Sequence, residues 1–133
     1  MRWYRPLLYL WASPASLAGL LPLPIVLLQG GRVQWVRGVA EIHGGIVTKL
    51  LTRGMPWMRF GASAMTLGHV VWGQDVKCLE RSRDHEHVHV RQYERWGPLF
   101  IPAYLVASLI AWRRGLDPYM DNPFEVEAYR EAP

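Results

Sequence analysis

The stretch His85-Glu86-His87-Val88-His89 fits the pattern HExxH, and its requirements decide the fold around it. On an α-helix, residues four positions apart lie on one face a turn apart, so His85 and His89 would stand side by side. Two imidazoles in that arrangement can share one metal ion, and zinc accepts nitrogen and oxygen ligands of this kind. His87 lies two positions from each outer histidine and should point away from the ion. The stretch predicts a helix with a metal-binding face.

The residues around this pattern favour such a helix. The segment from Val76 to Trp96 contains no proline or glycine, and Gly97-Pro98 follows it as a stop signal. Candidate N-cap residues are Asp75, Ser82 and Asp84. Several charged side chains would form a solvated side of the helix, which is also what the pattern would look like without a metal: Arg81, Arg83, Asp84, Arg91, Glu94 and Arg95.

A third ligand is offered by the later stretch Asn122-Pro123-Phe124-Glu125-Val126-Glu127-Ala128-Tyr129. Asparagine at an N-cap followed by proline predicts that a helix starts here. Glu125 would then either bind the metal or complete a capping box with Asn122. In the second case Glu127 becomes the ligand. We favour Glu125 and keep Glu127 as the alternative.

An HExxH pattern followed by a glutamate on a later helix resembles gluzincin-type metallopeptidases, which have the zincin fold. In several such families a small residue stands three positions after the third ligand, as Ala128 does after Glu125. The next residue is often aspartate in those families, and here it is Tyr129. The resemblance covers a short part of the chain, so it implies a type of site and no named subfamily. It implies a zinc-dependent hydrolase, specifically a metallopeptidase acting on a peptide or protein substrate.

The implied chemistry is metal-assisted hydrolysis. Zinc held by His85, His89 and Glu125 would lower the pKa of a bound water towards neutrality. Glu86 would act as general base, taking the proton of that water and delivering it to the leaving amine. A further donor to the oxyanion is expected, and the sequence leaves four candidates: His69, Tyr93, Tyr119 and Tyr129.

The resemblance also implies where a substrate would lie. In zincins the strand near the metal helix is a sheet edge that pairs with an extended substrate through backbone hydrogen bonds. The candidate edge directly before the metal helix consists of Met65, Thr66, Leu67, Gly68, His69 and Val70. The alternative is an ordinary buried strand.

The rest of the chain predicts an α+β fold, with a small β-sheet packed on the metal-binding helix and two further helices. Apolar residues on both sides of Arg37-Gly38 predict a short hairpin. Residues 46–52 predict a helical turn or two, and residues 62–72 predict a strand. We divide the chain into residues 1–30, an apolar N-terminal segment that would serve as a membrane anchor, and residues 31–133, a zincin-like domain.

Composition narrows the class of protein. A chain of 133 residues, half of them hydrophobic, fits one domain with a real core. The single Cys78 excludes an internal disulfide and a cysteine-rich zinc knuckle. The net charge of +4 comes from scattered basic residues without a nucleic-acid-binding motif, so no nucleic acid is expected as a partner.

The segment from Leu7 to Leu28 is uncharged and follows Arg2 and Arg5. It is long enough to span a bilayer, although its prolines and glycine would break a regular helix. A secretion signal is less favoured, because Ser16-Leu17-Ala18 is a poor cleavage site. The remaining alternative is that the segment packs on the core. We favour membrane attachment, with a cytoplasmic location as the alternative.

The segment from Pro98 to Trp112 is also apolar, and the metal site restricts its placement. His89 precedes the segment and Glu125 follows it. A bilayer crossing would separate the two ligands by about 30 Å of hydrocarbon, whereas metal–ligand bonds are about 2 Å long. The segment must therefore be a buried core helix, a re-entrant helix or an in-plane helix.

The main alternative function is a different class of protein altogether. In it, the chain is a non-catalytic, membrane-associated protein, and HExxH is coincidental or supports a structural metal.

Overall fold

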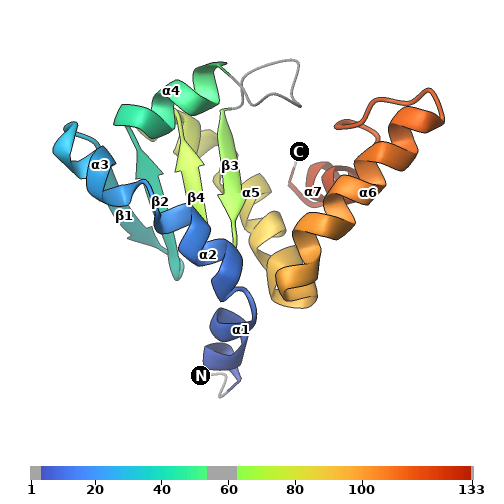
Figure 1. Ribbon diagram of the computed structural model, residues 1–133, viewed down its shortest axis with the longest axis horizontal. Coiled ribbons are helices and arrows are strands. Elements are labelled where there is room, and N and C mark those ends of the chain that lie inside the picture. The colour runs from blue at the N-terminus through green and yellow to red at the C-terminus, as the bar shows by residue number, and fades with distance from the viewer. Residues whose placement is uncertain (1–3, 54–62, 133) are drawn as a thin grey trace.

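The computed structural model describes residues 4–53 and 63–132. A small mixed sheet is covered by helices on both faces, which is an α+β fold (Figure 1). The elements are α1 (Arg5–Trp11), α2 (Ser13–Leu20), α3 (Leu23–Leu28), β1 (Arg32–Val36), β2 (Val39–His43), α4 (Gly45–Arg53), β3 (Ala64–Leu67), β4 (Val70–Gly73), α5 (Val76–Trp96), the 3-10 helix η1 (Gly97–Leu99), α6 (Phe100–Arg113) and α7 (Pro123–Glu131).

The four strands lie in the order β1-β2-β4-β3. The outer pairs are antiparallel hairpins, and the central pair β2–β4 is parallel. Arg37 and Gly38 both have positive φ angles, 53° and 79°, as a type I′ hairpin turn requires. The hairpin predicted at this position is confirmed. Among the described residues, β3 is an edge strand that pairs with β4 alone.

Each face of the sheet packs against different helices. On one face, β2 and β4 contribute Ile42 and Val70 to a core shared with α3 and α4. On the other face, Val71 packs against Leu79 and Val90 of α5. The alternation follows from the two-residue period of a strand, which sends successive side chains to opposite faces.

Helix α5 has the bounds that its flanking residues predict. The carboxylate of Asp75 accepts a hydrogen bond from the backbone N–H of Cys78 at 2.7 Å, which makes Asp75 the N-cap. Gly97 follows the last helical residue with a φ of 59°. Helix α4 also forms where a helical turn or two was predicted.

The single strand predicted for residues 62–72 is wrong. The described part, from residue 63 on, forms two strands, β3 and β4, and Gly68-His69 is the loop between them. Gly68 has a φ of 63°, the conformation required at the first loop position of a type II′ turn. Ala62 lies outside the described residues. The hairpin brings a second strand into the sheet and leaves β3 at the edge.

The N-terminal segment forms short helices that cover one face of the sheet. Helix α2 lies close to β4, because Gly19 has no side chain and Trp72 Nε1 donates to the Gly19 carbonyl at 2.9 Å. No single helix in the described ranges is long and apolar enough to cross a membrane. The pair Arg5–Trp11 and Ser13–Leu28, bent by 66°, meets the length and composition requirements only when the two parts are taken together.

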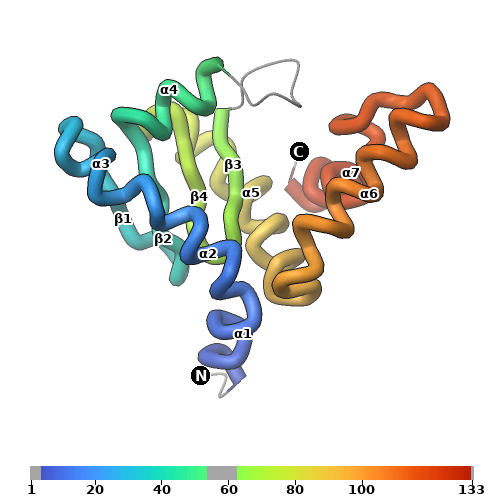
Figure 2. Tube along the Cα trace, in the orientation of Figure 1, coloured from blue at the N-terminus to red at the C-terminus, as the bar shows by residue number. Residues whose placement is uncertain are grey.

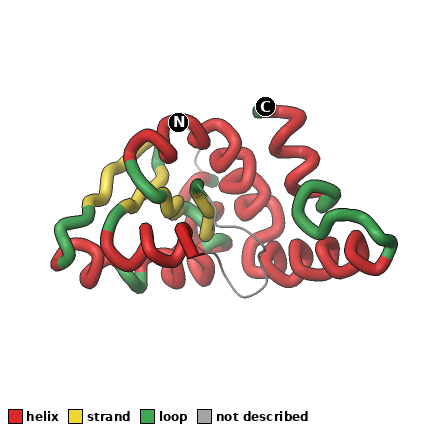
Figure 3. Tube along the Cα trace, turned by 90° about the horizontal axis from the view of Figure 1, so that it is seen from above, coloured by secondary structure: helices red, strands yellow, loops and turns green. Residues whose placement is uncertain are grey.

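Helix α6 leaves the body of the protein as an arm, and α7 returns beside it towards α5 (Figure 2). Seen from above, the strands gather in one half of the molecule and the other half holds helices and loops (Figure 3). Of the residues of α6, only Phe100 and Ala111 are buried. Placement of this segment as a buried core helix, one of the three predicted options, is therefore wrong.

Candidate metal centre

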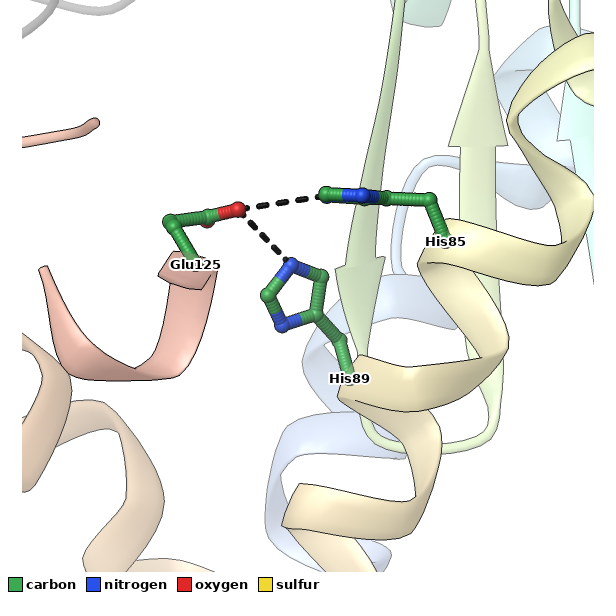
Figure 4. Close-up of side chains that lie close together, drawn as sticks. All are labelled: His85, His89 and Glu125. Carbon is green, nitrogen blue, oxygen red and sulfur yellow. Dashed lines mark hydrogen bonds and ion pairs between the residues drawn. The ribbon is translucent and has the colours of Figure 1, made fainter. Parts of the chain in front are cut away.

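His85 and His89 of α5 converge with Glu125 of α7 (Figure 4). Glu125 Oε1 lies 3.2 Å from His85 Nε2 and 3.1 Å from His89 Nε2. One ligand atom from each residue lies within 4.8 Å of the others. The i, i+4 spacing supplies the histidine pair, as expected for one helix face. The first turn of α7 supplies the carboxylate, because Asn122 caps that helix and accepts a hydrogen bond from Phe124 N.

The hydrogen bonds of His89 fix which of its ring nitrogens carries a proton. Gln92 donates through its amide nitrogen to the Phe124 carbonyl and to Glu127, so its amide oxygen is the atom facing His89. His89 Nδ1 therefore donates to that oxygen at 2.8 Å. In a neutral imidazole, Nε2 would then direct a lone pair at the Glu125 carboxylate. That contact requires a positive charge, from a proton or from a metal ion.

The electrostatics of the pair show the same demand. Burial alone would lower the pKa of His89, but the hydrogen bond and negative charge of Glu125 outweigh it and raise the pKa to about 9. Burial alone would raise the pKa of Glu125, but the contacts with His85 and His89 lower it to about 2. Two imidazole nitrogens and a carboxylate oxygen are a donor set that suits zinc.

Glu125 is held from its other side by the arm. Tyr104 of α6 donates its hydroxyl to Glu125 Oε2 at 2.7 Å. Burial raises the pKa of Tyr104, so the hydroxyl stays protonated and keeps donating. Asn122 is completely buried and donates to the Tyr104 carbonyl and to Ser108 Oγ. Tyr104 had been assigned only to a membrane interface by its sequence context, yet it contacts the site.

Glu127, the alternative third ligand, lies apart from the cluster. Its carboxylate accepts a hydrogen bond from Gln92 at 2.6 Å and lies 3.7 Å from Arg95. Glu125 does not form the capping-box contact that was its other expected role, because its carboxylate faces the histidines and Tyr104. The geometry therefore brings Glu125, and not Glu127, to His85 and His89.

Glu86, the candidate general base, lies between this cluster and the sheet. Its Oε2 lies 3.8 Å from His85 Nε2, and Thr66 donates to its Oε1 at 3.0 Å. Burial raises the pKa of the Glu86 carboxyl above its ordinary value. The carboxylate is thus fixed beside the histidine pair and poised to accept a proton.

The candidate substrate edge is divided by the hairpin. Met65, Thr66 and Leu67 lie in the edge strand β3, and Gly68 and His69 form the turn. Val70 instead lies in β4, where it pairs with Ala40 on one side and Leu67 on the other, so its inclusion in the edge is wrong. The reason is that the chain reverses direction at Gly68.

His87 points away from the cluster, as its spacing predicts. It lies near Glu41 of β2, whose buried carboxylate forms a two-pronged ion pair with Arg83. Burial lowers the pKa of His87. His69 is also elsewhere, because its Nε2 lies 2.8 Å from Glu94 and its ring stacks on another aromatic residue.

Two of the four candidate oxyanion donors have other partners. Tyr93 donates its hydroxyl to the Thr66 carbonyl at 3.2 Å, and His69 pairs with Glu94. The other two lie beside the cluster. The ring of Tyr129 is 4.4 Å from that of His85, and the hydroxyl groups of Tyr119 and Tyr129 are 3.2 Å apart.

A pocket of about 420 Å³ adjoins the cluster through His85. It lies along α5 between the β1–β2 turn, which contributes Arg37, and the end of α7, which contributes Glu131. His87 lies in its wall. The pocket offers polar space next to one of the two histidines.

Sequence reasoning missed Tyr104 and Gln92 as partners of the site. For Gln92 a signal existed, since it stands three positions after His89 on the same helix. For Tyr104 no local signal existed, because its contact depends on how α6 packs against α7. Compared with known proteins, the chain matches no family model, no curated protein and no solved structure.

Proposed function

We propose that this protein is a zinc-dependent hydrolase, and specifically a metallopeptidase. The observation that carries the proposal is the convergence of His85, His89 and Glu125 from two helices, with an imidazole nitrogen directed at a carboxylate. Glu86 stands beside this group with no role in holding its ligands. A structural site needs ligands alone, whereas a hydrolase also needs a base.

Each residue has a role that follows from its position. His85, His89 and Glu125 would hold zinc with a fourth position open. Bound zinc would polarise a carbonyl and acidify a water molecule. Glu86 would accept a proton from the attacking water and pass it to the leaving amine. Its raised pKa makes it a stronger base than an exposed carboxylate, and Thr66 keeps it in place.

The edge strand β3 would bind the substrate. A two-residue hairpin loop makes Leu67 and Val70 a hydrogen-bonded pair, so the backbone N–H and C=O of Thr66 point away from β4. The bond from Tyr93 to the Thr66 carbonyl agrees with that orientation. A peptide added to this edge as a further strand would run past Glu86, which contacts Thr66.

The hydroxyl groups of Tyr119 and Tyr129 are the proposed donors to the oxyanion. They are the two candidates whose rings lie on the α7 side of His85 and whose hydroxyl groups contact only each other among the hydrogen bonds of the described side chains. A neutral phenol can donate to a developing negative charge.

The test combines metal content with hydrolysis. Purified protein is analysed for zinc by mass spectrometry and incubated with denatured casein and with a mixture of fluorogenic peptides. We expect one zinc per chain and cleavage of at least one probe. Glu86→Gln should keep zinc and lose hydrolysis by roughly 10²-fold or more, the usual contribution of a general base. Glu80→Gln, an exposed position on the same helix, is the matched control and should keep both.

The other outcomes discriminate the remaining functions. Full activity in Glu86→Gln would reject the mechanism. Zinc without hydrolysis of either probe by the wild type would favour a structural metal site, and the near-complete burial of Glu86 and His89 is the observation that makes this the second candidate. Absence of zinc would reject both.

A further inference from the structure

Helix α6 presents two unlike faces. Towards the protein it directs Phe100, Tyr104, Ser108 and Ala111, at helical spacing, and two of these carry hydroxyl groups. The opposite face is apolar and exposed, and it consists of Ile101, Leu105, Val106, Leu109, Ile110 and Trp112. We call these six residues the outer face of α6. A helix on the surface of a water-soluble domain has the reverse arrangement.

The outer face is continuous and large. Leu105, Leu109 and Trp112 are 51%, 52% and 63% exposed, and no charged residue interrupts the helix before Arg113. Apolar patches of this kind mark surfaces that bind a membrane or another protein. The face needs a partner that removes leucine and isoleucine side chains from water.

Charge complementarity identifies the partner as a lipid surface. No acidic residue occurs between residues 1 and 40 or between residues 95 and 116, so the apolar helices of this chain are flanked by arginines alone. Arg113 and Arg114 directly follow the outer face, with Trp112 beside them. Basic residues attract anionic headgroups, and tryptophan favours the boundary between headgroups and acyl chains.

The chemistry of the outer face also disfavours a protein partner. Interfaces between proteins carry about one hydrogen bond per 100–200 Å², which requires polar side chains within the contact. Trp112 is the sole member of the outer face with a polar atom in its side chain. A bilayer makes no such requirement.

The length and attachments of α6 decide its orientation. Its 14 residues extend about 21 Å, short of the roughly 30 Å of hydrocarbon in a bilayer. Tyr104 and Ser108 are bonded to Asn122 or Glu125 of the site, which holds the inner face against the protein. We infer that the outer face of α6 docks in the plane of a lipid bilayer containing anionic lipid.

The inference stands apart from the proposed hydrolase activity, and vesicles test it. The probes are vesicles of phosphatidylcholine alone and of phosphatidylcholine with phosphatidylglycerol, and binding is measured by co-sedimentation. We expect binding to the mixed vesicles. The double variant Leu105→Gln and Leu109→Gln should weaken it at least about tenfold, because two apolar side chains no longer enter the bilayer. Val33→Gln, an exposed position on β1, is the matched control.

A second measurement reads out the surface directly. In a Cys78→Ser background, an environment-sensitive fluorophore on Leu105→Cys should shift to shorter wavelengths on the mixed vesicles, and one on Val33→Cys should not. Circular dichroism and zinc content confirm that the variants fold. Unchanged binding of the double variant together with an unshifted fluorophore at position 105 would overturn the inference. A stable oligomer of wild-type protein that binds no vesicles and is dissociated by the double variant would replace the bilayer with a second copy of the chain.

Discussion

The two ring nitrogens of His89 face an amide oxygen and a carboxylate, and that asymmetry makes the metal-free protein sensitive to pH. The folded-state pKa of His89 is raised from 6.5 to about 9, so its contribution to stability is complete below pH 6.5 and is lost as the pH rises through 9. The pKa of Glu125 is lowered from 4.5 to about 2, so its contribution is complete above pH 4.5 and is lost as the pH falls through 2.

Both contributions are complete between pH 4.5 and 6.5. We therefore expect the melting temperature of chelator-treated protein to be highest in that window and to fall towards pH 9. The raised pKa of Glu86 acts in the same direction, because its charged form is disfavoured in the folded state. Thermal melting across this range checks the expectation, and a melting temperature that rises from pH 6.5 to 9 would contradict it.

The hydroxyl of Tyr104 acts on the metal through Glu125. Tyr104→Phe keeps the ring and removes the bond to Glu125 Oε2, so the carboxylate loses the group that orients it. We expect zinc affinity to fall by about 10-fold or more, within the usual range for partners of metal ligands. Titration with a fluorescent zinc chelator measures the change. Tyr9→Phe removes a hydroxyl bond far from the site and should leave the affinity as it was.

Glu125 and Glu127 provide a matched pair on one helix. Glu125→Gln should abolish tight zinc binding, because an amide is a poor zinc ligand and the carboxylate between the two histidines is lost. Glu127→Gln should retain it, because Glu127 contacts Gln92 and Arg95 instead. Metal content after dialysis distinguishes them. The reverse order would transfer the role of ligand to Glu127.

At the scale of elements, the helices with local end signals were predictable. Asp75 and Gly97 define α5 because their preferences act within a few residues of chain. The start of α7 at Asn122 follows in the same way. The pairing of His85 with His89 was equally local, because it needs one helix and nothing else.

The elements that depend on distant contacts were not predictable from the sequence. In the β3–β4 hairpin, Gly68 was the only turn signal within an apolar run, so two strands looked like one. In α6, nearly uniform apolarity hides which side faces the protein, and the contacts of Tyr104 and Ser108 with α7 decide that. Choosing Glu125 over Glu127 required the same packing to be known.

The packing of α2 on the sheet depends on one glycine. A Cβ atom at Gly19 would lie 2.9 Å from the Cβ of Val70 and 3.1 Å from that of Leu67. We expect Gly19→Ala to destabilise the protein by about 1–3 kcal/mol, the usual range for overpacking. Urea denaturation measures the loss. Leu17→Ala, an exposed position on the same helix, should change stability far less, and equal effects would contradict the close approach of α2.

At the scale of the whole molecule, the candidate site is shared by three parts of the fold. Helix α5 supplies both histidines and Glu86, β3 supplies Thr66, and the α6–α7 arm supplies Glu125 with Tyr104. The sheet and α5 pack on each other without the arm, through Val71, Leu79 and Val90. Zinc would therefore connect the arm to a body that is already formed.

This connection predicts which part of the protein loosens without metal. After chelation we expect trypsin to cleave at Arg113-Arg114, at the end of α6, while the sheet and α5 stay resistant. Zinc should restore protection. Mass spectrometry of the fragments over time gives the order of cleavage. Equal rates with and without zinc would show that the arm is held by its side-chain contacts alone.

The distance along the chain between the ligands gives zinc a further consequence. Glu125 lies 36 positions after His89, so an ion bound to both closes a loop that contains all of α6. In the chain-entropy treatment of cross-links, closing a loop of this length stabilises the folded state by about 4 kcal/mol relative to the open chain. In a chain with a single cysteine, the metal would serve as a reversible staple, which a disulfide cannot provide here.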